Sequence, residues 1–383
     1  MWHLPGRLTA IAVLTCLATG VLADPAPADP ALPKNRNVLF WNDQERDAGF
    51  RAMEKVFPTR TVSRGEKVQE LAQGAPLSVP NLDQYMTNER TAAIVVLQDG
   101  RARLEAYRRN FDAAGRWTSF SVAKSFTSTL VGAAVRDGYI RSIEDDVTAY
   151  IPELKGSGYE GVNIRQILTM TSGVRWSEDY ADRNSDVARF LAENPTDGSD
   201  PTVSYLRRLP REAEPGTKWV YKTGETNLIG VLVTRATKKT LADYLAEKVW
   251  RPYGMEQDAA WVTTENGQEI GGCCMSLAAR DYARMGQFIL DGGQGVLPEG
   301  WLAQATRKQA DIGQPGFGYG FQWWTRDDGT FAARGIFGQM VNIDPARRLV
   351  TVILSDWDKA TTLERSITRE RFLKTIAAAA DAR

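Results

Sequence analysis

β-Strand patterns occur near both ends of this chain and enclose a helical middle. Residues 92–98, which include Ile94 to Leu97, predict a strand, and the Asp99-Gly100 turn leads into a returning strand over 101–108. The strands predicted near the C-terminus cover residues 318–325, 331–335, 339–343 and 348–356, followed by a helix over 362–380. The pattern indicates an α+β fold. Its antiparallel sheet is built from both termini, with flanking helices and an inserted helical lobe at about 139–270.

The first 23 residues have the pattern of a secretory signal peptide. A weakly positive start precedes an apolar run from Leu8 to Ala18, which is short for a membrane span, and Val21-Leu22-Ala23 offers a cleavage site. A retained N-terminal anchor is the alternative. Residues 24–37 are rich in Pro and Ala and indicate a linker, so the folded domain is expected over 38–383. We expect a periplasmic or secreted protein with no stable membrane span after cleavage.

Removal of this segment would also remove the only histidine, His3. A mature chain without histidine excludes a Ser-His-Asp triad, a Cys-His pair and a histidine-ligated zinc site. A general base must then be Lys, Tyr, Asp or Glu. No metal or cofactor is expected. The 47 basic and 47 acidic residues balance, so nucleic acid is not an expected partner, and a small-molecule substrate is.

Two cysteines remain after the signal segment, the adjacent Cys273 and Cys274. Neighbouring cysteines cannot connect distant segments, and a disulfide between them is strained. The pattern therefore favours two small buried thiols behind Gly271-Gly272 over a disulfide.

A hydroxyl and an ammonium occur three residues apart in Ser121-Val122-Ala123-Lys124, at the start of a predicted helix that ends near Gly138. Helix geometry places both on one face, one turn apart. Free N–H groups at a helix start favour a negative charge on the Ser121 oxygen, so Ser121 is a candidate nucleophile with Lys124 beside it. A chain of this length contains about one S-x-x-K by chance, so the prediction depends on further groups.

Tyr221 is the candidate acceptor for the Ser121 proton. It follows a Pro-Gly turn and precedes a predicted helix. The ammonium groups of Lys124 and Lys222 are expected to lower its pKa from the usual value of about 10. A strand edge with two glycines, Arg334 to Gln339, offers backbone N–H groups to an oxyanion. A core aromatic and a strand bulge are the structural alternatives for these two segments.

Together, Ser121–Lys124, Tyr221–Thr223 and Ala333–Ile336 resemble the serine β-lactamase and penicillin-binding protein superfamily, in order and in separation. The likeness is greatest to its class C-related esterase and amidase branch, which includes the 6-aminohexanoate-dimer hydrolases. The resemblance implies that Ser121 is acylated and that Lys124 and Tyr221 exchange its proton. It also implies an oxyanion hole made by the N–H groups of Ser121 and Ile336. The residues that it implies for substrate binding are Tyr180, Thr223, Arg334 and Gly335.

The chain departs from the β-lactamase motifs at three positions. Thr223 stands where Asn is usual, and Ala333-Arg334 replace the Lys-Thr of a Lys-Thr-Gly motif. The cation that would meet a β-lactam carboxylate is thus missing or moved to Arg334. We therefore expect a serine hydrolase that cleaves a linear ester or amide, with no acidic residue evident near Ser121 for deacylation. A β-lactam-active enzyme or peptidoglycan D,D-peptidase, and a non-catalytic cell-envelope binding protein, are the alternatives.

Overall fold

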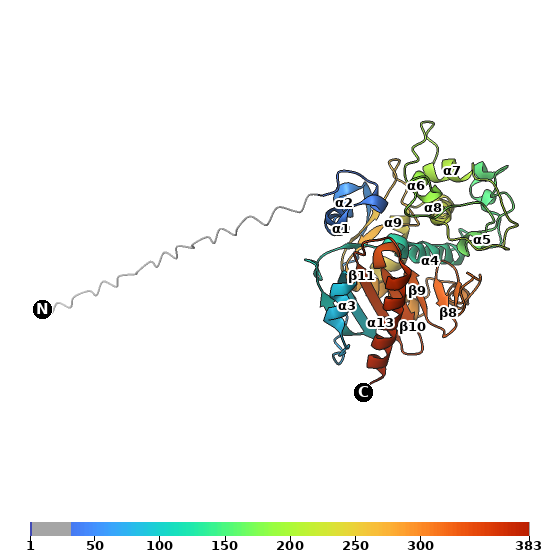
Figure 1. Cartoon of the computed structure of the whole chain (residues 1–383). Coiled ribbons are helices and arrows are strands. Elements are labelled where there is room, and N and C mark those ends of the chain that lie inside the picture. Colours follow the sequence, from blue (N-terminus) through green and yellow to red (C-terminus); the bar gives the residue numbers. More distant parts are fainter. Residues whose placement is uncertain (2–31, 383) are drawn as a thin grey trace. The chain divides into compact units, whose positions relative to one another are not determined.

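The computed structural model describes residue 1 and residues 32–382 (Figure 1). The predicted signal peptide and the first part of the predicted linker, residues 24–31, lie outside the described residues, so both stay predictions. Within the described part of the chain, no helix combines the length and the apolar character that a membrane crossing needs.

A seven-stranded antiparallel sheet joins the two ends of the domain, as predicted. Its order is β3-β2-β11-β10-β9-β8-β7. The N-terminal hairpin consists of β2 (Thr91–Gln98) and β3 (Arg101–Tyr107), and β2 pairs with β11 (Leu349–Ser355). The other strands are β7 (Phe317–Tyr319), β8 (Trp324–Arg326), β9 (Phe331–Arg334) and β10 (Met340–Asp344). The single strand predicted at 318–325 is thus two strands, because the chain turns at Gln322, where φ is 63°.

The sheet is covered on both faces, which explains the continuous apolar run in β2. Ile94 and Val96 pack with α3 (Leu82–Asn88) and α13 (Leu363–Asp381) on one face. Val95 and Leu97 belong to the main core on the other face, where α11 (Ala279–Leu290) lies against β10 and β11. Gly286 permits this close approach, since a Cβ there would come 2.5 Å from Val350.

A second, four-stranded sheet was not predicted. Its order is β1-β5-β6-β4, from β1 (Thr59–Val62), β5 (Ala259–Val262), β6 (Met275–Leu277) and β4 (Trp117–Thr118). β4 leads directly into the Ser121 turn, and β6 follows Cys273-Cys274. At their junction the Ser119 N–H donates to the Met275 carbonyl at 2.7 Å, and the Met275 N–H donates to Ser119 Oγ at 2.8 Å. This sheet therefore fixes the cysteine pair beside the start of the Ser121 helix.

The named elements between β4 and β5 are all helices, joined by long irregular segments. The long ones are α4 (Ala123–Arg136) and α8 (Thr223–Thr237), which pack against each other and are buried over most of their length. The shorter ones are α5 (Ile164–Leu168), α6 (Asp186–Phe190), α7 (Pro201–Leu206), α9 (Leu241–Leu245), a π-helix (Ala246–Trp250) and α10 (Arg251–Tyr253). Helices α1 (Asp43–Gly49) and α2 (Met53–Val56) precede β1, and α12 (Trp301–Ala305) precedes β7.

Candidate active site

Ser121 lies in a 3₁₀ turn, Phe120–Val122, directly before α4, and Lys124 lies in the first turn of α4. Lys124 Nζ is 3.0 Å from Ser121 Oγ. Only 8% of Ser121 and 1% of Lys124 are exposed. The pair that the spacing predicted is therefore in contact, and it lies almost out of solvent.

The Lys124 amine is held by neutral partners. Its Nζ lies 3.0 Å from Thr223 Oγ1 and donates to the Gly272 carbonyl at 2.7 Å. Burial lowers the pKa of Lys124 to about 7, because desolvation disfavours the ammonium, while the charge of Glu178 opposes this change. A lysine with this pKa is neutral in about half of the molecules at neutral pH, so it can accept a proton from Ser121.

Tyr221 lies beside this pair, but its acidity differs from the expectation. Its ring centroid is 5.2 Å from Lys124 Nζ, and the ring stacks on Trp324 at 5.4 Å. Burial raises the pKa of Tyr221 well above 10, the charge of Glu178 raises it further, and a hydrogen bond with Ser121 lowers it. The predicted lowering by lysines is therefore wrong. Lys222 is a buried partner of Glu225, 3.7 Å away.

Glu178 is the acidic group that sequence reasoning missed. It accepts hydrogen bonds from the Thr223 N–H at 2.9 Å, from the Tyr180 hydroxyl at 2.9 Å, and from the Thr223 hydroxyl and the Trp176 indole N–H. Thr223 thus connects Lys124 to a carboxylate, and Tyr180 contacts the same carboxylate. Glu178 lies between two aromatic residues in the Trp176–Tyr180 segment, and this was the available signal for it. The sequence analysis considered that segment only for Tyr180.

The predicted oxyanion-hole residues lie in the first turns of two short 3₁₀ helices, Phe120–Val122 and Ile336–Gly338. N–H groups in such first turns have no partner within their own helix. Gly335 allows the two turns to approach, because a Cβ there would come 2.6 Å from the Ser119 carbonyl oxygen. The residues after Ser119 and after Ile336 both have positive φ, 42° for Phe120 and 59° for Phe337. Non-glycine residues with such φ values are often found at functional sites.

Two cavities meet at Ser121, and Tyr180 and Ile336 also line both of them. We call the first the apolar chamber. Its wall includes Leu39, Met53, Phe57, Val187, Phe190, Leu191, Ile270, Cys273 and Cys274. We call the second the arginine cleft. Its wall includes Tyr221, Trp324, Arg334, Gly335, Trp357, Thr361, Ser366 and Arg369.

Arg334, the candidate for a moved cation, is already paired. Its Nη2 is 2.9 Å from Glu370 on α13, and its guanidinium lies over Trp324 at 5.5 Å. Arg369, which is 4% exposed and lies over Trp357 at 5.0 Å, is a second cation in the wall of the arginine cleft. The cleft wall therefore carries two arginines, and the one at the motif position is already paired with Glu370.

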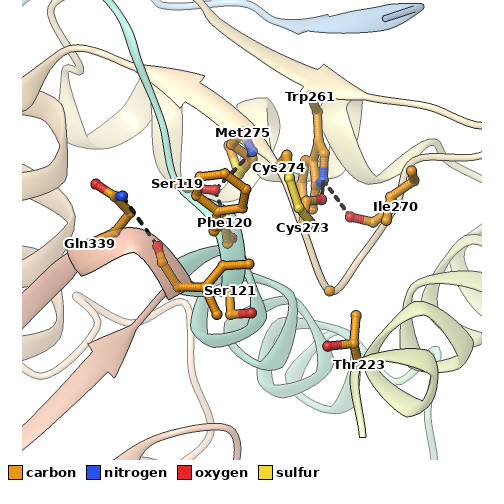
Figure 2. The surroundings of a disulfide bond; sticks show 12 residues. Ser119, Phe120, Ser121, Thr223, Trp261, Ile270, Cys273, Cys274, Met275 and Gln339 are labelled. Carbon is orange, nitrogen blue, oxygen red and sulfur yellow. Dashed lines mark hydrogen bonds between the residues drawn. A yellow bond between two sulfur atoms is a disulfide. The ribbon is translucent and has the colours of Figure 1, made fainter. Parts of the chain in front are cut away.

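A disulfide joins Cys273 and Cys274, so the favoured prediction of two free thiols is wrong. Figure 2 shows this disulfide between Trp261 and the turn that carries Ser121. Both cysteines line the apolar chamber. The Trp261 indole N–H lies 3.0 Å from the Ile270 carbonyl and 3.1 Å from the Cys273 carbonyl, which holds the segment in place.

This fold and this arrangement define a serine hydrolase of the β-lactamase type, and comparison with known proteins agrees. The family model for β-lactamase matches residues 80–375, so the chain belongs to the β-lactamase family. A 6-aminohexanoate-dimer hydrolase of Paenarthrobacter ureafaciens is 30% identical over 337 residues, 82% of this chain and 86% of the relative.

Two solved structures share the fold at low sequence identity. A Bacillus anthracis protein assigned provisionally as a 6-aminohexanoate-dimer hydrolase has a TM-score of 0.79 at 21% identity, covering 91% of this chain and 98% of its own. A class C β-lactamase has a TM-score of 0.58 at 15% identity, covering 79% of this chain and 95% of its own. The predicted fold class and the predicted superfamily are therefore confirmed.

Proposed function

We propose that this protein hydrolyses a linear ester or amide through an acyl-enzyme on Ser121. The observation that carries the proposal is the contact of Ser121 Oγ with Lys124 Nζ at 3.0 Å, in a site where burial lowers the Lys124 pKa to about 7. A neutral amine at this distance can remove the hydroxyl proton as Oγ attacks the substrate carbonyl.

The remaining steps use groups around this pair. As the Oγ–carbon bond forms, the N–H groups of Ser121 and Ile336 stabilise the negative carbonyl oxygen. Tyr221 donates its proton to the leaving nitrogen or oxygen as that bond breaks, and the Lys124 ammonium returns a proton to Tyr221. A water then repeats the sequence on the acyl-enzyme, releasing the acid and restoring Ser121. Thr223 contacts Lys124 and positions it, and the charge of Glu178 opposes the fall in the Lys124 pKa.

The pairing of Arg334 favours linear substrates over β-lactams, because a paired arginine is not free to bind the β-lactam carboxylate. The motif position that usually presents lysine holds Ala333, and Arg334 is bound to Glu370. The 6-aminohexanoate-dimer hydrolase at 30% identity also supports amide hydrolysis.

The test is a hydrolysis panel on the mature protein, with Ser121→Ala as the blank. The substrates are a short-chain nitrophenyl ester, a linear aminohexanoate amide and a chromogenic cephalosporin. We expect ester or amide turnover that disappears in Ser121→Ala, together with labelling of Ser121 by a fluorophosphonate. Turnover of the cephalosporin alone would move the assignment to a β-lactam-active enzyme. No turnover and no labelling would indicate a binding protein.

We further propose that the mature enzyme acts outside the cytoplasm, supported by the signal-peptide pattern of residues 1–23. Cell fractionation with mass spectrometry of the N-terminus tests this. Cleavage before Asp24 and recovery in the periplasm or medium are expected, and an intact N-terminus in the cytosolic fraction would contradict the proposal.

A further inference from the structure

The position of Tyr221 assigns the two cavities to the two halves of a substrate. Among the described residues, Tyr221 lines the arginine cleft and not the apolar chamber. A group that protonates a leaving atom must come within hydrogen-bond reach of it. If the function proposed above holds, the leaving group therefore lies in the arginine cleft, and the acyl group extends into the apolar chamber.

The chamber wall is built largely from hydrocarbon. Leu39, Met53 and Phe57 come from the segment before β1, and Val187 and Phe190 come from α6. The disulfide adds a surface without a titrating thiol. The first three residues precede residue 80, where the match to the family model begins. This side of the chamber is therefore not accounted for by the family match.

The carboxylates of the chamber wall, as far as the structure describes it, are already paired. Both oxygens of Glu193 lie 2.9 Å from Arg208 Nη2, and Ser204 donates to one of them. Glu265 forms an ion pair with Arg36. An ammonium on the acyl chain would have to break one of these pairs or lie unpaired among apolar side chains. Lying unpaired among apolar side chains costs free energy that an uncharged chain does not lose. Breaking a pair costs less, because Arg36, Glu265 and Arg208 are 53%, 65% and 56% exposed and solvent screens their charges.

We propose that the apolar chamber binds an uncharged aliphatic or aryl acyl group, and that the enzyme discriminates against acyl chains that end in an ammonium. Selection against the charge arises because the chamber combines apolar walls with carboxylates that are already neutralised. The natural substrate class is then an ester or amide of a simple carboxylic acid, not of an ω-amino acid.

The first test compares two nitrophenyl esters with one leaving group and acyl chains of equal length. Heptanoyl ends in a methyl group where 6-aminohexanoyl carries its ammonium, and background hydrolysis is measured with Ser121→Ala. We expect kcat/KM for the heptanoyl ester to be at least about tenfold higher. Equal values overturn this inference and leave the proposed function standing. No Ser121-dependent turnover of either ester overturns both.

The second test supplies the missing carboxylate. Leu191 lines the chamber and is 40% exposed, so Leu191→Glu adds a solvated, unpaired charge without emptying the core. We expect the heptanoyl preference to fall by at least about tenfold, through better use of the 6-aminohexanoyl ester. Val68→Glu is the matched control, because Val68 is 39% exposed and, in the described chain, lines neither cavity. An unchanged preference in Leu191→Glu, or an equal change in both variants, would overturn the inference.

Discussion

Replacing Glu178 by Gln removes one charge from the site and leaves its shape nearly unchanged. One carboxylate oxygen accepts from the hydroxyls of Thr223 and Tyr180, and these hydroxyls can turn to accept from an amide N–H instead. The other oxygen accepts from the Thr223 N–H and the Trp176 indole N–H, and an amide oxygen can do the same. Glu178→Gln is therefore expected to fold and to keep Thr223 in place.

The expected change in the Lys124 pKa follows from the opposite effects of burial and of the Glu178 charge. Burial lowers the Lys124 pKa from 10.5 to about 7, which corresponds to about 5 kcal/mol in favour of the neutral amine. Glu178 acts against burial by stabilising the ammonium, so its removal lowers the pKa further. Below that pKa the ammonium form of Lys124 predominates in the native enzyme. The variant should hold a larger neutral fraction there.

The assay is the pH profile of kcat/KM for a nitrophenyl ester between about pH 5 and about pH 9, normalised to each variant's plateau. We expect an acid limb near pH 7 in the native enzyme and a limb at lower pH in Glu178→Gln. Glu66→Gln, which alters an exposed and solvent-screened carboxylate, should leave the limb in place. A limb that stays fixed or moves to higher pH in Glu178→Gln would refute the assignment of Lys124 as the base.

The remaining predictions concern proton donation, the oxyanion turns, structural charge and metal independence. Tyr221→Phe should lower kcat by about 10²–10⁴ while Ser121 still reacts with a fluorophosphonate, and near-full activity would contradict a donor role. Gly335→Ala places a Cβ 2.6 Å from the Ser119 carbonyl oxygen and should lower kcat by about 10²-fold with an unchanged circular dichroism spectrum; a native kcat would show that this close approach is dispensable. Asp356 is fully buried and accepts hydrogen bonds from Arg46, Arg90 and Arg109. Asp356→Asn should therefore lower the free energy of unfolding of the protein by about 3–5 kcal/mol in urea titrations, and an unchanged midpoint would argue against that network. A chelator should leave activity unchanged, and inhibition reversed by added metal would reopen a metal mechanism.

Local geometry explains which parts of the site could be predicted from the sequence. Ser121 and Lys124 are three residues apart on one helix, so the helical repeat alone brings them together. The sheet was predictable for a similar reason, because runs such as 91–98 and 349–355 are apolar and bounded by turn residues. The four-stranded sheet was missed because β4 and β6 are only two and three residues long and offer no such pattern.

Contacts between distant segments could not be predicted in the same way. The Gly272 carbonyl that accepts from Lys124 is 148 residues away in sequence, and Thr223 is 99 residues away. Glu178 reaches Thr223 only because the Trp176–Tyr180 segment packs against the start of α8. Such contacts depend on tertiary packing, and a single sequence carries no local signal for them.

The pKa of Tyr221 is raised, although the sequence predicted that it is lowered. This difference explains how a site without histidine can separate its base from its acid. The nearby Lys124 and Lys222 suggested a Tyr221 phenolate. Of these, Lys124 is close enough to act, but it is itself desolvated and its own charged form is disfavoured. Burial disfavours the charged form of each group, and the charged forms are opposite in kind, an ammonium for Lys124 and a phenolate for Tyr221. One dry environment therefore lowers one pKa and raises the other. At neutral pH this leaves a free amine to receive the Ser121 proton and an intact phenol to protonate the leaving group, which is the division of roles that the proposed mechanism requires.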